Sequence, residues 1–196
     1  MRNCTAMVLM AVAGWNASAA EKTKVDVYLN GRDASEQLLG PAKVLVSGIY
    51  DQIGVRLIWH CGELPARRDT SRPAFAVRTA GHPLDSATSE ALASARIVGS
   101  GGAEIVVYQD RLERLLAGHQ TIAGVGAAYV LAHELAHVMQ GEARHSQAGI
   151  LKAHWSEEDY REMVFHKLVF TPADVDLIHR GLAAQQGVGA DSVNSF

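Results

Sequence analysis

The chain has 196 residues, of which 48% are apolar, and this fits one folded domain with a substantial core and excludes a disordered chain. The 18 lysines and arginines against 21 acidic residues leave a net charge of −3, which removes the electrostatic basis for binding nucleic acid. Two cysteines, Cys4 and Cys61, are too few for a disulfide framework or a thiolate zinc site.

The first 20 residues have the pattern of a signal peptide. Arg2 gives a positive start, residues 4–15 form an apolar run, and the Ala-Ser-Ala sequence at 17–19 supplies the small residues that a signal peptidase requires. We expect cleavage after Ala19 or Ala20 and export to the periplasm or out of the cell, with an uncleaved N-terminal helix as the alternative. The apolar run is shorter than the roughly 20 residues of a membrane-spanning helix, so no integral membrane segment is expected.

Val25, Val27 and Leu29 alternate with polar neighbours and predict a strand at 24–30. Short segments rich in apolar residues predict three further strands, at 55–60, 74–78 and 104–108. Apolar residues at helical spacing predict a helix over 35–53, which Gly54 ends. A shorter helix is expected near 89–95. This order of elements predicts an α+β domain with a twisted, mixed sheet of about four strands and a helix packed beneath it.

Helices are expected over the last part of the chain, at 110–116, 122–140, 156–170 and from 171 onward. Gly141 stands where a C′ residue would stop the second of these helices. Thr171-Pro172 supplies an N-cap and a first helical residue for the last one. We expect a single domain over residues 21–184, with a small C-terminal helical part, and a mobile tail over 185–196.

Residues with catalytic chemistry gather in the long apolar helix, in the sequence His133-Glu134-Leu135-Ala136-His137. Two histidines four residues apart lie on one face of a helix, so both imidazoles can bind one zinc ion. Glu134 lies beside that face, where it is too far round to be a ligand but well placed to accept a proton from a zinc-bound water. Glu134 is therefore the candidate general base. The alternative is that these side chains are merely solvated on a helix surface.

A catalytic zinc site needs a third protein ligand and an open position for water. His145 is the candidate, because Gly141 ends the helix and lets the chain turn back over the metal. Glu157 and Glu158 compete for this role, but carboxylates at the start of a helix also interact favourably with its dipole, and we prefer that interpretation. Tyr129, one turn before the motif, could face the same cleft, although an aromatic residue at that spacing is expected in the core.

Residues 133–155 resemble the zinc-binding segment of the metzincin metalloproteases, and the pair His145-Ser146 resembles the matrixins in particular. That family has H-E-x-x-H, a turn glycine, a third histidine, and then a tight turn with methionine under the metal. Here Gly141 and His145 stand one and two positions further along than in the family pattern, and Leu151 stands at the place of the methionine.

The resemblance implies a metzincin-like zinc peptidase. A single Zn²⁺ on His133, His137 and His145 would polarise the scissile carbonyl and acidify a water whose proton Glu134 accepts. The strand at 104–108 would be the rim against which an extended substrate pairs. We expect an exported, monomeric enzyme that acts on peptides or proteins. A zinc hydrolase with a non-peptide substrate and a non-catalytic zinc-binding module are the alternatives.

Overall fold

The computed structural model describes residues 21–30, 39–66, 71–82, 91–98, 102–117 and 123–191. The expected signal peptide and residues 192–196 lie outside the described residues. The helix expected over 35–53 is shorter in the described part, because residues 40–41 form a turn and the helix begins at Ala42 with Pro41 as its N-cap; residues 35–38 lie outside the described part. The described helices and strands are, in chain order, β1 (Thr23–Leu29), α2 (Ala42–Gln52), β2 (Val55–Cys61), β3 (Ala74–Ala80), β4 (Ala93–Val98), β5 (Gly102–Tyr108), α3 (Gln109–Ala117), α4 (Ala123–Gln140), α5 (Glu157–Val164) and α6 (Pro172–Asp191).

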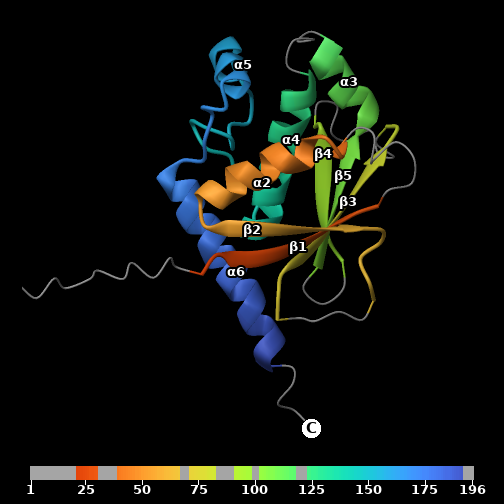
Figure 1. Cartoon of the computed structure of the whole chain (residues 1–196), viewed down its shortest axis with the longest axis vertical. Helices are drawn as coiled ribbons and strands as arrows, with labels where there is room; N and C mark the ends of the chain where they lie inside the picture. Colours follow the sequence, from red (N-terminus) through yellow and green to blue (C-terminus); the bar gives the residue numbers. More distant parts are fainter. Residues whose placement is uncertain are drawn as a thin grey trace, which may run out of the picture.

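The five described strands form one sheet in the order β2-β1-β3-β5-β4 (Figure 1). β2, β1, β3 and β5 run parallel to one another, whereas β4 is antiparallel to β5 and forms one edge of the sheet. Parallel neighbours require a crossover connection, and α2 lies in the crossover between β1 and β2. The expected combination of helices with a mixed sheet is confirmed, with five strands instead of about four.

β4 corrects an expectation from the sequence. A short helix is expected near 89–95, but residues 93–98 pair with β5, from Ala93 opposite Val107 to Val98 opposite Gly102. Alanine and serine are compatible with a helix in isolation, and here pairing with a neighbouring strand decides in favour of the strand. Residues 83–90 lie outside the described part of the chain.

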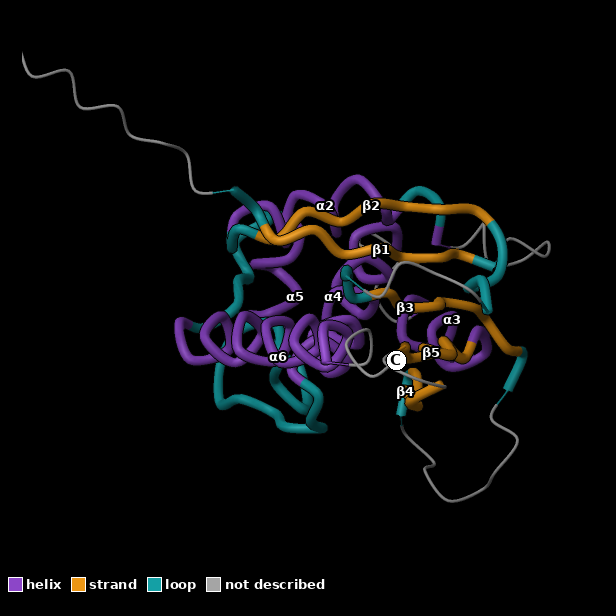
Figure 2. The backbone as a smooth tube through the Cα atoms, turned by 90° about the horizontal axis from the view of Figure 1, so that it is seen from below, coloured by secondary structure: helices purple, strands orange, loops and turns teal. Residues whose placement is uncertain are grey.

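The core lies between one face of the sheet and the helices. Val25, Val27 and Leu29 of β1 alternate along the strand and are fully buried on that face. α4 contacts each of the other described helices and also β4 and β5 (Figure 2). Its residues 127–132 are all buried. A helix packed on so many sides is a rigid support for the side chains that it carries.

α4 ends where the sequence predicts. Gly141 has φ 76°, a left-handed conformation that favours glycine, and its backbone N–H donates to the carbonyl of His137 at 3.0 Å. The chain therefore leaves the helix within one turn of the second histidine of the motif. The prediction that Gly141 stops this helix is confirmed.

The helix expected over 156–170 is shorter than predicted, because α5 ends at Val164. His166 adopts φ 55°, and the backbone N–H of Lys167 donates to the carbonyl of Glu162 at 2.8 Å. These features end the helix in the way that a glycine at C′ usually does. A histidine in this role is uncommon, so the sequence contains no recognisable stop.

α6 begins after Thr171, as predicted, and continues to Asp191, past the expected end of the domain at residue 184. The side-chain amide of Gln185 donates to the carbonyls of Val138 and Met139 at 3.0 and 3.1 Å. These bonds join α6 to the last turn of α4. None of the described helices combines the length and the apolar character that crossing a membrane requires.

Candidate metal centre

Three histidines converge at the end of α4. His133 and His137 lie one turn apart on the same face of the helix, and His145 returns to them from the loop that follows. One ligand atom from each of the three lies within 4.8 Å of the others. The ring centroids are 4.6 Å apart for His133 and His137, 5.3 Å for His133 and His145, and 5.0 Å for His137 and His145. The three side chains are therefore close enough to bind one metal ion.

A hydrogen bond fixes the orientation of His133. Its Nδ1 lies 2.9 Å from the carbonyl oxygen of Ile150, and because a carbonyl only accepts, Nδ1 carries the proton. The lone pair is then on Nε2, which faces Nε2 of His137 at 2.9 Å. Trp155 Nε1 donates to the same carbonyl at 3.3 Å, and its ring meets the His133 ring edge-on. A carbonyl behind the imidazole is the usual support of a metal-binding histidine.

The spacing of the nitrogens fits a small cation. Two nitrogens bound to a tetrahedral zinc at about 2.0–2.1 Å lie roughly 3.3 Å apart. The Nε2 atoms of His133 and His137, at 2.9 Å, need only a small movement to reach that distance. Three imidazoles suit zinc and other borderline transition metals, and they leave the fourth position of a tetrahedral site open. An open position is typical of catalytic zinc sites.

Burial keeps the two helical histidines uncharged. It lowers the pKa of His133 to about 4. The hydrogen bond to the Ile150 carbonyl raises this pKa, whereas the nearby His137 and His145 lower it further. Burial also lowers the pKa of His137, and His145 adds to this effect, while the backbone of Glu142 opposes it. Neutral imidazole is the form that binds metal, so both side chains can accept a metal ion at neutral pH.

Glu134 is half-buried and lines the same cleft as the histidines, without belonging to the group of potential ligands. Burial alone raises the pKa of Glu134 to about 7. A carboxylate with a pKa near the working pH can accept a proton and later return it. The acidity of Glu134 therefore suits a general base, and this role stays a prediction.

The turn beneath the histidines is tight and buried. Gly149 has φ 75°, and a Cβ built on it would lie 2.3 Å from the carbonyl oxygen of Val169, so only glycine fits. Ile150 and Leu151 follow and are fully buried. The backbone N–H of Ser146 donates to the carbonyl of Leu151 at 2.7 Å, which ties the loop that carries His145 to this turn.

The three histidines and Glu134 line an open cleft of about 560 Å³, a volume in the usual range of ligand sites. Residues 91–95, which include the start of β4, line it beside the histidines. The sequence alone assigns no role to Trp155, which both lines this cleft and supports His133. It stands in a loop without periodicity, so no sequence pattern marks it. The remaining apolar lining includes Leu115, Val130 and Tyr160.

The strand beside this cleft is β4, and this corrects the prediction that residues 104–108 form the substrate rim. Those residues belong to β5, which pairs with β3 on one side and with β4 on the other. A strand flanked on both sides cannot pair with a further one. β4 has a neighbouring strand on one side only among the described residues, so its other edge can pair with an extended chain.

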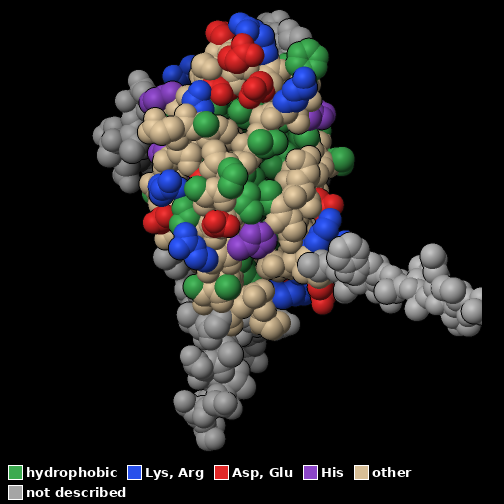
Figure 3. Space-filling model, turned by 90° about the vertical axis from the view of Figure 1, so that its left-hand side faces the viewer, with side chains coloured by type: hydrophobic (Ala, Val, Ile, Leu, Met, Phe, Trp, Pro, Cys, Tyr) green, Lys and Arg blue, Asp and Glu red, His purple; other side chains and the backbone are tan. Residues whose placement is uncertain are grey.

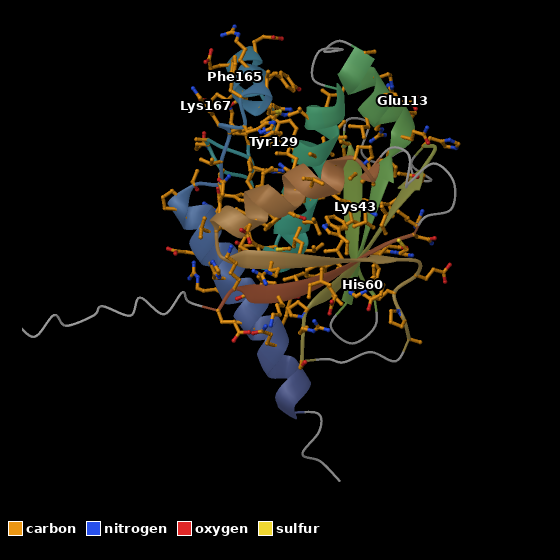
Figure 4. All side chains as sticks on the ribbon, in the orientation of Figure 1. Lys43, His60, Glu113, Tyr129, Phe165 and Lys167 are labelled. Carbon is orange, nitrogen blue, oxygen red and sulfur yellow. The ribbon has the colours of Figure 1, made fainter. Side chains whose placement is uncertain are left out.

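The other candidates from the sequence lie outside the histidine group. Glu157 and Glu158 are exposed in the first turn of α5, and Glu158 forms an ion pair with Arg161 at 2.5 Å. Tyr129 lies in the upper half of α4 (Figure 4), where it is fully buried and is not part of the cleft lining. Burial, with Glu162 nearby, raises the pKa of Tyr129 to about 12. Its interpretation as a core residue is confirmed.

A second groove, of about 580 Å³, lies between α2, the start of α4 and residues 166–170. Val44 and Val169, which line it, are 82% and 50% exposed. Apolar side chains are also visible among charged ones on the left-hand face of the molecule (Figure 3). His166 is the one titratable residue among the described residues that line this groove. The groove therefore lacks the chemistry that gathers in the first cleft.

Comparison of the chain with protein-family models and with curated proteins found no match. The function of the centre is therefore inferred from its donor atoms, its charges and the cleft around it.

Proposed function

We propose that the chain is a zinc-dependent peptidase of the metzincin type, exported after removal of residues 1–19 or 1–20. One arrangement carries the proposal: three histidines converge in an open cleft that Glu134, with a pKa of about 7, also lines. The resemblance of residues 133–155 to the metzincin zinc-binding segment supports the choice of a peptidase among the zinc hydrolases.

Each side chain of the centre has a distinct role in this proposal. A zinc ion held by the three histidines would act as a Lewis acid toward the substrate carbonyl and lower the pKa of a nearby water. His133 is oriented for binding by the Ile150 carbonyl. Glu134 accepts the proton of the attacking water and, because its pKa is near neutral, passes it on to the leaving amine.

An extended peptide is the substrate class that the cleft supports best. The open edge of β4 offers backbone donors and acceptors for pairing with an extended chain. Residues 91–95 on this edge line the same cleft as Glu134 and the histidines. Leu115, Val130 and Trp155 add apolar surface for substrate side chains. A peptide paired with β4 would therefore present its backbone to the metal centre.

Zinc-dependent hydrolysis of peptides tests the proposal. The purified chain should bind one zinc, cleave members of a peptide library, lose activity to a chelator and recover it with zinc. Glu134→Gln should retain zinc and lose about 100- to 10,000-fold in kcat, the usual contribution of a general base. Glu113→Gln is the matched control, because Glu113 is an exposed glutamate on α3 that does not line the cleft (Figure 4).

Other outcomes would select the alternatives. Loss of zinc from Glu134→Gln would make Glu134 a ligand. Zinc-dependent hydrolysis of esters without peptide cleavage would favour a non-peptide hydrolase, and bound zinc without hydrolysis would favour a binding module.

The export step is tested by the N-terminus of the protein recovered outside the cytoplasm, which should be Ala20 or Glu21. Recovery of only the intact chain, in the cytoplasm, would contradict export.

A further inference from the structure

His145 is the most exposed of the three histidines, and it lies on a loop, whereas His133 and His137 are fixed by α4. Its position therefore depends on what holds the loop. The residues on either side of it, Arg144 and Ser146, both contact the carboxylate of Asp174. Arg144 Nη1 lies 3.6 Å from Oδ1 of Asp174, and the hydroxyl of Ser146 donates to the same oxygen.

Asp174 is fully buried in the first turn of α6. Its Oδ2 accepts from the backbone N–H of Thr171 at 3.1 Å and from the Thr171 hydroxyl at 2.7 Å. The backbone N–H of Asp174 in turn donates to Thr171 Oγ1 at 3.2 Å, which completes a capping box. Oδ2 of Asp174 thus caps the N-terminus of α6, and Oδ1 holds the loop that carries His145. Because α6 packs against α4, the loop is anchored relative to the helix that carries the other two histidines.

We propose that Asp174 is a positioning residue for the metal centre. Its buried carboxylate holds both chain neighbours of His145 and so keeps this histidine facing His133 and His137. The inference rests on the proposed metal centre and adds a residue to it. Asp174 does not belong to the group of potential ligands, so its effect on the metal acts through His145.

The chemistry of a buried carboxylate makes this role testable. A carboxylate without water around it needs compensating partners, and Arg144 with the donors of Ser146 and Thr171 provides them. Asn in place of Asp174 keeps the shape but has no charge, and one of its two polar atoms donates instead of accepting. Because the backbone N–H of Thr171 can only donate, the amide oxygen stays with Thr171 and the amide NH₂ faces Ser146 and Arg144. Ser146 then no longer donates and the ion pair with Arg144 is lost, so the anchor of the loop is weakened.

Asp26 provides a matched control. It is also a buried carboxylate, and it lies in β1. Its Oδ1 lies 2.8 Å from Nε2 of His60, and its Oδ2 lies 3.3 Å from Nε of Arg72. None of these residues lines the cleft or is a chain neighbour of one of the three histidines. Asp26→Asn should therefore lower folding stability, as Asp174→Asn does, without the effect on the metal.

Zinc affinity of the full chain, measured in competition with a chromophoric chelator, tests the proposal. Asp174→Asn should weaken zinc binding by about 10- to 100-fold, the range typical for residues that orient metal ligands. Ser146→Ala should weaken it in the same direction and tests the role in a variant that keeps the capping box. Asp26→Asn should leave zinc affinity unchanged, while urea unfolding of the zinc-free proteins shows a loss of stability for both Asp→Asn variants.

A double-mutant cycle separates positioning from a general structural role. In a His145→Ala background, Asp174→Asn should not weaken zinc binding further, because the histidine that Asp174 positions is absent. An equal loss in both backgrounds would overturn the proposal, and so would wild-type zinc affinity in Asp174→Asn and Ser146→Ala. If Asp174→Asn does not fold, the same cycle with Ser146→Ala decides.

The failure of this inference differs from a failure of the proposed function. If the wild-type chain binds no zinc, or if His145→Ala binds it as tightly as wild type, the metal centre itself is wrong and the inference falls with it. If His145→Ala weakens zinc binding while Asp174→Asn and Ser146→Ala do not, the metal centre stands and only the role of Asp174 is overturned.

Discussion

Gly181 of α6 lies so close to Met139 of α4 that a Cβ on Gly181 would be 2.1 Å from the Met139 carbonyl oxygen. The two helix backbones approach each other here because glycine has no side chain. Asp174 belongs to the first of these helices, and His133 and His137 belong to the second. The contact at Gly181 therefore sets the distance between the helix that carries Asp174 and the helix that carries His133 and His137.

Gly181→Ala should destabilise the protein. The added methyl group must displace backbone atoms, and overpacking of this kind costs typically about 1–3 kcal/mol of unfolding free energy. Gly48→Ala is the control, because Gly48 is also helical and a Cβ there meets nothing within 4 Å. It should stabilise the protein by about 0.5–1 kcal/mol. Urea unfolding measures both, and a Gly181→Ala variant as stable as wild type would contradict the close contact.

The part of the site that the sequence predicts is the part that depends on local geometry. Two histidines at i and i+4 share a helix face whatever the rest of the fold is, and a glycine in a left-handed conformation stops α4 wherever the helix packs. Glu134, His133 and His137 could therefore be identified from a few residues of sequence. His145 could be added because the loop after Gly141 is short.

The features that the sequence did not reveal depend on distant partners or on unusual local choices. β4 exists because residues 93–98 pair with β5, and its own composition is equally compatible with a helix. Asp174 stands three residues after Thr171, a spacing typical of a capping box, but its second contact, with Ser146, joins residues far apart in the chain. His166 ends α5 without the glycine that would mark a stop.

The zinc-free protein should show opposite pH effects from His133 and Glu134. The pKa of His133 in the folded chain is about 4, below its ordinary value of 6.5, so stability falls as pH drops from 6.5 toward 4. The pKa of Glu134 is about 7, above its ordinary value of 4.5, so stability rises as pH drops from 7 toward 4.5. Between pH 7 and 5 the two contributions oppose each other.

Glu134→Gln separates these contributions. In wild type, protonation of Glu134 should add roughly 2 kcal/mol to the unfolding free energy as the pH falls from 7 to 5. Glu134→Gln lacks the carboxylate and should not show this gain. Urea unfolding of the zinc-free proteins at the two pH values measures this difference. Glu113→Gln should follow wild type, because that glutamate is exposed. Parallel pH profiles for Glu134→Gln and wild type would show that the pKa of Glu134 is not raised.

The identity of the third ligand should appear directly in zinc affinity. His145→Ala should weaken zinc binding severely, because the site is left with two protein ligands and must fill the gap with water. Glu157→Ala and Glu158→Ala should bind zinc like wild type, with at most a fraction of a kcal/mol lost from the helix dipole. Titration against a competing chelator measures all three. If a glutamate variant loses zinc while His145→Ala retains it, the centre has two histidines and a glutamate.

The register of β4 predicts which of its backbone groups face the open edge. The backbone N–H of Tyr108 donates to the carbonyl of Leu92 at 2.9 Å, so these two residues form a hydrogen-bonded pair. Hydrogen-bonded and non-hydrogen-bonded pairs alternate along an antiparallel ladder, and Ala95, opposite Ile105, falls in a non-hydrogen-bonded pair. The N–H of Ala95 therefore points away from β5, toward the side where a substrate would pair.

Ala95→Pro should remove this outward N–H without removing a hydrogen bond to β5. Proline is tolerated on an edge strand where the N–H faces solvent, so folding and zinc content should be retained. The loss of one backbone hydrogen bond to the substrate, worth about 0.5–1.5 kcal/mol, should lower kcat/KM for peptides about 2- to 10-fold. Ala95→Val adds bulk at the same position but keeps the N–H, and its kcat/KM should be affected less. If the two variants lose activity equally, side-chain bulk explains the effect and the peptide does not pair with β4 at Ala95.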